Sequence, residues 1–201
     1  MTMREETSSA AEPIALFKEW LTEAEKKESN NHTAMSLATA DAEGMPSVRM
    51  VLLKDVDERG FVFYTNSESR KGTEIAANPN ASLCFHWKSM LKVVRVDGAV
   101  EKVSDADADA YFNSRSRGSQ IGAWASRQSR PLENRFKLEK KIAAYTAKFH
   151  IGKVPRPDFW KGYRVVPRRI EFWAERTFRL HDRIVYTIEG NGDWMSQRLY
   201  P

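Results

Sequence analysis

Along the first third of the chain, the spacing of apolar residues changes from a helical period to a strand period. Between Pro13 and Lys27, apolar residues recur every three or four positions, which predicts one amphipathic helix. From Ala34 onward, short apolar runs alternate with turn residues and predict strands over 34–40, 47–54 and 60–66. We expect these three strands to form an antiparallel meander, because the links 41–44 and 55–60 have turn chemistry.

The remainder of the chain is predicted to have helices in the middle and strands at the end. A short helix is expected over 68–77, and two strands follow over 81–87 and 91–103, the second interrupted at Asp97-Gly98. Further helices are expected over 105–114, 119–126 and 132–149. The last strands are expected over 162–166, 169–173, 184–188 and 194–199, with a hairpin turn at 189–192.

This order of elements is typical of an α+β fold. Strands, then helices, then strands predict a single domain built on an antiparallel barrel or curled sheet with helices around it. A length of 201 residues suits one sizeable core. We therefore expect residues 13–201 to form this domain, and the small, polar residues 1–12 to be a disordered N-terminal segment.

The composition is that of an ordinary globular protein, with 41% hydrophobic and 29% charged residues. No apolar run approaches the roughly 20 residues that span a bilayer, so no membrane partner is expected. The N-terminus also lacks the apolar core of a signal peptide. Cys84 is the only cysteine, which excludes an internal disulfide, and the histidines have no metal-ligand spacing. These features predict a cytoplasmic protein without a metal site.

The net charge of +5 admits a nucleic-acid-binding hypothesis. However, the 32 basic residues are offset by 27 acidic ones and are spread along the whole chain. The sequence has no zinc finger and no RNP-type aromatic strand. A small anionic ligand explains the same positive excess. An RNA-binding basic domain is therefore the weaker hypothesis, and no nucleic-acid partner is expected.

The segment from Arg49 to Lys71 carries the strongest chemical signal. Arg49 and Lys54 bracket four apolar residues, which predicts two cations at the two ends of one buried strand. Arg70 and Lys71 follow another predicted strand, where a helix begins. Each of these side chains alone fits a snorkelling or solvated residue. Cations held together beside strand ends and a helix N-terminus favour a phosphate, so the segment predicts an anion site.

Two further groups of polar residues lie near the predicted helices. Tyr111 and Arg115 share one face of their helix, and with Ser119 they offer a phenol, a guanidinium and a hydroxyl to a phosphate. A solvated helix end is the alternative interpretation. Gln128 and Ser129 offer amide and hydroxyl hydrogen bonds, which is a weaker signal.

A third group lies close to the C-terminus. In an extended segment 178–183, Arg179, His181 and Arg183 share one face. Three cationic or titratable groups on one face need either water or an anion, so an exposed edge and a ligand site stay equally open. Trp173 is a core residue by default, although its ring is also suited to a flat ligand.

Taken together, these segments resemble the pyridoxine (pyridoxamine) 5′-phosphate oxidase family, and the match extends from about Pro13 to Pro201. The most specific motifs are Arg49-Met-Val-Leu-Leu-Lys54, Phe63-Tyr-Thr-Asn66, Ser119-Gln-Ile-Gly-Ala-Trp124, Ile170-Glu-Phe-Trp173 and Arg179-Leu-His-Asp-Arg183. The resemblance implies a split β-barrel with surrounding helices, and a homodimer with FMN bound at the subunit interface.

The resemblance also implies which residues bind each ligand. Those around FMN would be Arg49, Met50, Val51, Leu52, Leu53, Lys54, Tyr64, Thr65, Arg70, Lys71, Gln128, Ser129, Trp173 and Arg183. Those around the substrate phosphate would be Lys54, Tyr111, Arg115 and Ser119. Arg179, Leu180 and His181 would contact the substrate itself. Of these, Arg179 and His181 would lie over the pyridine ring as the catalytic pair, orienting the substrate and stabilising developing charge.

The implied reaction is the oxidation of pyridoxine 5′-phosphate and pyridoxamine 5′-phosphate to pyridoxal 5′-phosphate. FMN would accept a hydride from the substrate carbon C4′, and oxygen would then be reduced to hydrogen peroxide. A non-catalytic flavin- or haem-binding split-barrel protein is the alternative, but it would not need Tyr111, Arg115 and His181 together.

The sequence departs from the family pattern in two places. Where the family usually has a glutamine that contacts the flavin, this chain reads Lys92-Val93-Val94-Arg95-Val96, and the side chain of Val93 makes no hydrogen bond. The N-terminal arm is short and lacks the segment that closes over the substrate in some members. We expect altered flavin affinity or potential from the first departure, and no lid of that kind from the second.

Overall fold

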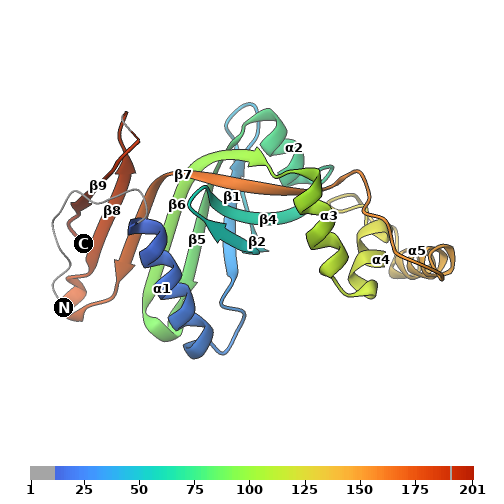
Figure 1. Ribbon diagram of the computed structural model, residues 1–201, viewed down its shortest axis with the longest axis horizontal. Coiled ribbons are helices and arrows are strands. Elements are labelled where there is room, and N and C mark those ends of the chain that lie inside the picture. The colour runs from blue at the N-terminus through green and yellow to red at the C-terminus, as the bar shows by residue number, and fades with distance from the viewer. Residues whose placement is uncertain (1–11, 191) are drawn as a thin grey trace.

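The computed structural model describes residues 12–190 and 192–201, and in them nine strands form one curled antiparallel sheet (Figure 1). Along the sheet the strands follow the order β2-β1-β5-β6-β7-β4-β3, and β8 joins β7 to β9. Their bounds are β1 Ala34–Ala40, β2 Pro46–Leu52, β3 Asp55–Asp57, β4 Gly60–Asn66, β5 Asn80–Trp87, β6 Lys92–Lys102, β7 Trp160–Ala174, β8 Asp182–Ile188 and β9 Trp194–Arg198.

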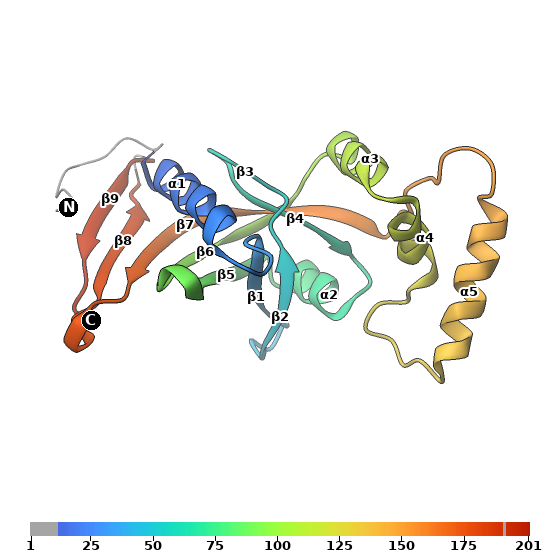
Figure 2. The same ribbon diagram turned by 90° about the horizontal axis from the view of Figure 1, so that it is seen from below.

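The helices lie around this sheet (Figure 2). Helix α1 packs on one face of the sheet, whereas α3, α4 and α5 form a lobe at the far end of β7. The α-helices are α1 Glu12–Lys27, α2 Arg70–Ala77, α3 Asp105–Ser114, α4 Arg117–Ala125 and α5 Arg135–Lys148, with 3₁₀ turns η1 Lys88–Met90 and η2 Thr177–Arg179. The predicted α+β fold on a curled antiparallel sheet with surrounding helices is therefore confirmed.

Local sequence sets the helix boundaries. Ser69, Ser104, Ser116 and Asn134 each accept a hydrogen bond from a backbone N–H of the first turn, as N-cap residues do. Helix α2 consequently begins at Arg70, with three residues between it and the end of β4 and two residues later than the predicted start at residue 68, and it ends at Ala77 as predicted. Residues 1–11, on which the predicted disordered segment largely falls, lie outside the described residues, and α1 already begins at Glu12.

Two hydrophobic cores hold these elements. The larger lies between α1 and the sheet, where the ring of Phe17 meets Phe61 edge-on at 4.8 Å and Phe85 at 4.9 Å between centroids. The smaller joins α3, α4 and α5 to the start of β7 through Phe112, Ile121, Phe149, Val154 and Trp160. Because the two cores meet along β7, the helical lobe has a fixed position at one end of the sheet.

The predicted meander is wrong. Strand β2 pairs with β1, but β4 pairs with β7 and β3, so β2 and β4 stand near opposite ends of the strand order. The curl of the sheet then brings these two strands into contact across the opening of the barrel. The segment 55–60 is also more than a turn, because its first residues form the short strand β3.

Two predicted strands near the C-terminus are one strand. Residues 160–174 form β7, which pairs with β4 along its first half, with β8 along its second half, and with β6 along most of its length. The pairing of β6 with β7 shifts register between Asp97 and Gly98, and the extra residue of this β-bulge is Arg168 in β7. The interruption predicted at Asp97-Gly98 is therefore wrong for the strand itself, because β6 runs unbroken from Lys92 to Lys102, and only its pairing with β7 is irregular there.

The extended conformation predicted for residues 178–183 is wrong in its first half. Thr177–Arg179 form the 3₁₀ turn η2, and both Phe178 and Arg179 have positive φ angles, of 58° and 63°. The strand β8 begins only at Asp182. Arg179, His181 and Arg183 therefore do not share one face of a strand.

We expect Gly98→Ala to lower the free energy of unfolding by about 2 kcal/mol, since a Cβ there would lie 2.0 Å from the Val166 carbonyl oxygen. Gly122→Ala is the matched control, because a Cβ at that position in α4 meets nothing within 4 Å. It should raise stability by about 0.5–1 kcal/mol through helix propensity. Urea denaturation measures both changes, and a neutral Gly98→Ala variant would contradict the role of the bulge.

Candidate active site

A cavity of about 810 Å³ opens between β2 and β4, the two strands that the curl brings together. The N-terminus of α2, the junction of α3 with α4 and the loop after α4 complete its walls. Its size is typical of a site for a cofactor or small substrate. The lining residues are Ser47, Val48, Arg49, Met50, Val51, Leu52, Lys54, Tyr64, Thr65, Arg70, Lys71, Tyr111, Arg115, Ser116, Ser119, Gln128, Ser129 and Trp160.

Most of the residues that the sequence indicated for ligand binding lie in this one cavity. The structure brings together the cations at 49–71, the group Tyr111, Arg115 and Ser119, and the pair Gln128 and Ser129. Four lining residues were not predicted: Ser47, Val48, Ser116 and Trp160. Two of them could have been found from the sequence. Ser47 lies two residues before Arg49 in a strand and so shares its face, and Ser116 is the N-cap residue of α4.

Strand β2 is not the buried strand that was expected. It is an edge strand, and Val48 and Met50 leave 68% and 63% of their surface exposed. Arg49 lies at its centre, not at its end, and Lys54 follows the strand. Leu53 packs in the larger core, so its side chain does not line the cavity. An open edge strand leaves backbone N–H and C=O groups available at the cavity wall.

A buried carboxylate that was not predicted, Glu74, fixes two of the cations. Its Oε2 accepts a hydrogen bond from Arg49 Nη2 at 3.0 Å, and its Oε1 accepts one from Arg70 Nε at 2.8 Å. Thr39 and Ser47 also donate to Oε2, at 2.5 and 2.6 Å. The i,i+4 spacing from Arg70 in a predicted helix is the signal that could have indicated this residue.

Glu74 stays ionised in this environment. Burial raises the pKa of the Glu74 carboxyl, but hydrogen bonds from Ser47 and Thr39, and then from Arg70 and Arg49, outweigh burial. The net effect lowers the pKa from 4.5 to about 2. The two arginines therefore keep a charged, hydrogen-bonded partner at neutral pH.

Lys71 is the most deeply buried cation of the cavity. Its Nζ lies 3.1 Å from Gln128 Oε1, 3.2 Å from Thr65 Oγ1 and 3.3 Å from Ser69 Oγ. Burial, followed by the charge of Arg49, lowers the pKa of the Lys71 ammonium. An anion placed beside it would offset both effects, so the surroundings of Lys71 favour a negatively charged ligand.

Stacked aromatic rings and Arg115 form the opposite wall. Tyr64 stacks on Tyr111 with 4.2 Å between ring centroids, and on Trp160 with 5.1 Å. The Arg115 guanidinium lies 5.1 Å from the Trp160 centroid. Its Nη1 is buried and has no hydrogen-bond partner among the described residues, and burial lowers the pKa of Arg115. A buried guanidinium nitrogen without a partner indicates a site for an anionic ligand.

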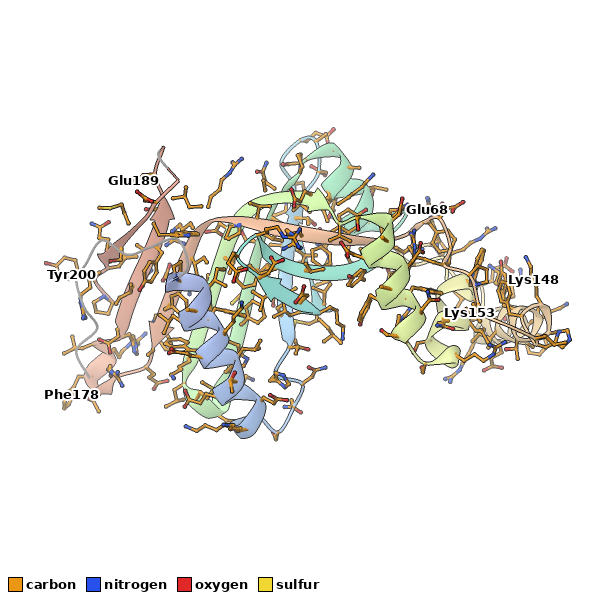
Figure 3. The ribbon with its side chains drawn as sticks, viewed as in Figure 1. Glu68, Lys148, Lys153, Phe178, Glu189 and Tyr200 are labelled. Atoms are coloured by element: carbon orange, nitrogen blue, oxygen red, sulfur yellow. The ribbon has the colours of Figure 1, made fainter. Side chains whose placement is uncertain are left out.

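Besides Leu53, five predicted site residues lie outside this cavity: Trp173, Arg179, Leu180, His181 and Arg183. Phe178, which precedes Arg179, lies at one end of the molecule, Lys148 and Lys153 lie toward the other end, and Glu68 lies between them (Figure 3). The C-terminal group has its own local order, because the rings of Trp173 and His181 lie 4.6 Å apart. The predicted site residues of a single chain thus fall into two separate groups, one in the cavity and one near the C-terminus.

Val93 lies beside the second of these groups. It is paired in register with Trp173, which is paired in turn with Arg183, so the three residues form one row across β6, β7 and β8. The position where the family usually places a flavin-contacting glutamine therefore lies beside two residues that the resemblance assigns to FMN.

The described part of the chain offers few other chemistries. It contains no group of three side chains suited to hold a metal ion. None of its helices has both the length and the apolar character needed to cross a bilayer. What the cavity combines is several fixed cations, hydroxyl groups and flat aromatic surface, which suits a planar molecule carrying a phosphate.

Comparison with known proteins shows the family of this chain. A model of the pyridoxamine 5′-phosphate oxidase family matches residues 21–149, and a model of the pyridoxine 5′-phosphate oxidase C-terminal dimerisation region matches residues 160–201. A protein of Brucella canis named pyridoxine/pyridoxamine 5′-phosphate oxidase is 61% identical over 195 residues, which are 96% of either chain.

Solved structures show the same fold. The chain superposes on PhzG from Burkholderia lata, solved in complex with tetrahydrophenazine-1-carboxylic acid, with a TM-score of 0.89 and 34% identity over 95% of this chain and 93% of that one. A pyridoxamine 5′-phosphate oxidase-related, FMN-binding protein of Nostoc punctiforme, 14% identical, superposes over the whole of both chains with a TM-score of 0.76 and shares the split-barrel fold. The chain therefore belongs to the pyridoxamine 5′-phosphate oxidase family.

Proposed function

We propose that two copies of this chain form an FMN-dependent oxidase of pyridoxine 5′-phosphate and pyridoxamine 5′-phosphate, with pyridoxal 5′-phosphate and hydrogen peroxide as products and oxygen as electron acceptor. The observation that carries the proposal is the cationic cavity in which Arg115 Nη1 is buried without a partner among the described residues. FMN and both substrates are phosphate monoesters, so the site needs two separate groups of anion-binding side chains. The cavity has both.

The first group suits the phosphate of FMN. Arg49, Arg70 and Lys71 lie around the N-terminus of α2, where backbone N–H groups add to their charge. Gln128 and Ser129 lie beside Lys71 and offer further hydrogen bonds. The residues present therefore fit FMN. When bound, FMN supplies the redox chemistry by accepting a hydride from the substrate.

The second group suits the phosphate of the substrate. Arg115 offers its unpaired Nη1, and Ser119 and Tyr111 offer hydroxyl groups from the same wall. Lys54 extends toward them, with its Nζ 5.9 Å from the centre of the Tyr111 ring. Together these residues would orient the substrate by its phosphate and exclude water beside the aromatic rings.

The remaining residues would come from a second protomer. Within one chain, Trp173, Arg179, His181 and Arg183 are remote from the cavity, and the segment that contains them matches a dimerisation region. A twofold arrangement that places this segment of each chain over the cavity of the other completes two equal sites. Arg179 and His181 would then orient the pyridine ring and stabilise charge that develops on it.

The purified protein is expected to be yellow, and without oxygen its bound FMN should be reduced by pyridoxine 5′-phosphate and by pyridoxamine 5′-phosphate. Pyridoxine without the phosphate should be a much poorer reductant, because it cannot occupy the Arg115 group. Visible absorbance during an anaerobic titration measures the reduction. If the protein binds FMN but neither phosphorylated substrate reduces it, the protein is a non-catalytic flavin-binding barrel and the proposal is wrong.

Arg115→Met should raise KM for pyridoxamine 5′-phosphate about 10- to 100-fold, because a charge-assisted hydrogen bond to the phosphate contributes about 1.5–3 kcal/mol. The variant should keep its thermal stability or gain some, since it loses a buried donor that has no partner among the described residues. FMN affinity is the internal control and should change little. An unchanged KM would show that Arg115 does not bind the substrate phosphate.

Glu74→Gln should lower the free energy of unfolding at neutral pH by about 3 kcal/mol, because Arg49 and Arg70 lose their charged partner. The native pKa of Glu74 lies below its usual 4.5, so its stabilisation is complete above that pH and is lost as the pH falls toward about 2. The gap between wild type and variant should therefore narrow across this window.

Guanidinium denaturation at several pH values measures this gap. Glu139→Gln is the matched control, because Glu139 makes an i,i+4 pair with Arg135 on the exposed face of α5. Its effect should stay within about 0.5 kcal/mol at every pH. A Glu74→Gln gap that does not depend on pH would show that the carboxylate charge is not what holds the two arginines.

A further inference from the structure

A second buried carboxylate, Glu171, lies in β7 and is 1% exposed. Its Oε1 accepts hydrogen bonds from Arg183 Nε at 3.0 Å and Nη2 at 2.8 Å, and from Arg95 Nη1 at 3.3 Å. Its Oε2 accepts one from Arg169 Nη2 at 2.6 Å. One carboxylate thus binds three guanidinium groups, and it binds Arg183 through two nitrogens.

Strand register places this cluster beside Trp173. Glu171 and Trp173 are two residues apart in β7, so their side chains share one face of the sheet. Arg183 is the β8 partner of Trp173 and reaches diagonally to Glu171, whereas Arg95 is the β6 partner of Glu171. The Glu171 carboxylate therefore lies next to the row of Val93, Trp173 and Arg183.

The charges in this cluster do not cancel. Arg95, Arg169 and Arg183 contribute three positive charges, whereas Glu171 and Asp97, which pairs with Arg169 at 3.1 Å, contribute two negative ones. Burial raises the pKa of Glu171, but hydrogen bonds from Arg169 and Arg183 outweigh burial and lower it. Glu171 is therefore ionised, and one positive charge is left over on this face.

The Arg183 guanidinium has a fixed orientation. Its Nε and Nη2 donate to Glu171, and its Nη1 donates to the Tyr200 carbonyl oxygen at 3.1 Å. A guanidinium has five N–H groups, so among the described residues two remain for a ligand. The side chain of Arg183 is 25% exposed, which keeps part of it accessible.

We propose that Glu171 is a positioning residue for FMN: it holds the Arg183 guanidinium beside Trp173 so that the remaining N–H groups of Arg183 bind the cofactor. The inference rests on the proposed function, in which Trp173 and Arg183 of one protomer contact the FMN of the other. Glu171 itself touches no ligand and acts through Arg183.

A positioning role for Glu171 and the effect of its charge alone predict opposite changes in FMN affinity for the substitution Glu171→Gln. Glu171→Gln removes a negative charge, which by charge alone would strengthen the binding of the anionic FMN. If Glu171 positions Arg183, the same substitution weakens FMN binding, because the guanidinium loses its two-nitrogen anchor. Asp97→Asn is the matched control, since it removes an equal charge from the same cluster without contacting Arg183.

The experiment is a fluorescence titration of FMN into the apoprotein dimer of each variant. We expect Glu171→Gln to raise the Kd for FMN at least tenfold, and Asp97→Asn to leave it unchanged or slightly lower. In an Arg183→Leu background, Glu171→Gln should change the Kd less than twofold, because its effect passes through Arg183. The midpoint potential of the bound flavin should fall in Glu171→Gln and stay constant in Asp97→Asn.

The possible outcomes are distinct. A Kd that is equal or lower in Glu171→Gln overturns the inference, as does a full effect that persists in the Arg183→Leu background. If Glu171→Gln does not fold, Glu171→Asp, which keeps the charge but shortens the reach, must raise the Kd, or the inference fails. The wild-type protein tests the proposed function separately. If it binds FMN and oxidises its substrates but the variants do not show the Kd changes expected above, only this inference is wrong and the proposed function stands.

Discussion

Strand β7 is the constraint on which the other parts of the structure depend. Its 15 residues pair with β6 along most of the strand, with β4 along the first half and with β8 along the second. The first half therefore anchors the wall of the cavity, and the second half carries Glu171 and Trp173 away from it. A strand rises about 3.3 Å per residue, which separates the two halves of β7 within one chain. In the dimer that we propose, a second protomer would bring its own second half to the cavity.

The two clusters of arginines have the same electrostatic arrangement. In each, a buried carboxylate forms ion pairs with several arginines. Glu74 pairs with Arg49 and Arg70, and Glu171 pairs with Arg183 and two others. Each carboxylate takes up only part of the hydrogen-bonding capacity of its arginines. Arg183, whose other N–H groups are held by Glu171 and Tyr200, keeps two N–H groups without a partner among the described residues, and this fixed orientation would lower the entropy lost when an anion binds. Preorganised cations of this kind suit an enzyme whose ligands all carry phosphate.

The sequence predicted the local features of this protein well. The bounds of β1, β4 and α3 were correct to the residue, because apolar alternation, glycine turns and serine caps act over a few positions. Most of the cavity residues were also indicated, since their chemistry is visible wherever they lie. Glu74 and Glu171 were missed because a buried carboxylate looks like a surface one until its partners are known. The turn at Phe178 was missed because neither Phe178 nor Arg179 is a residue type that favours positive φ.

The sequence by itself determined the fold class, the helices and strands, and the residues able to bind phosphate. Only the tertiary structure decided which of them meet. It placed β2 and β4 near opposite ends of the strand order and then curled the sheet so that they enclose the cavity. It also placed Arg183 beside Glu171 and away from Arg49. Such pairings join residues far apart in the chain, and they depend on the packing of all the strands together rather than on any local pattern.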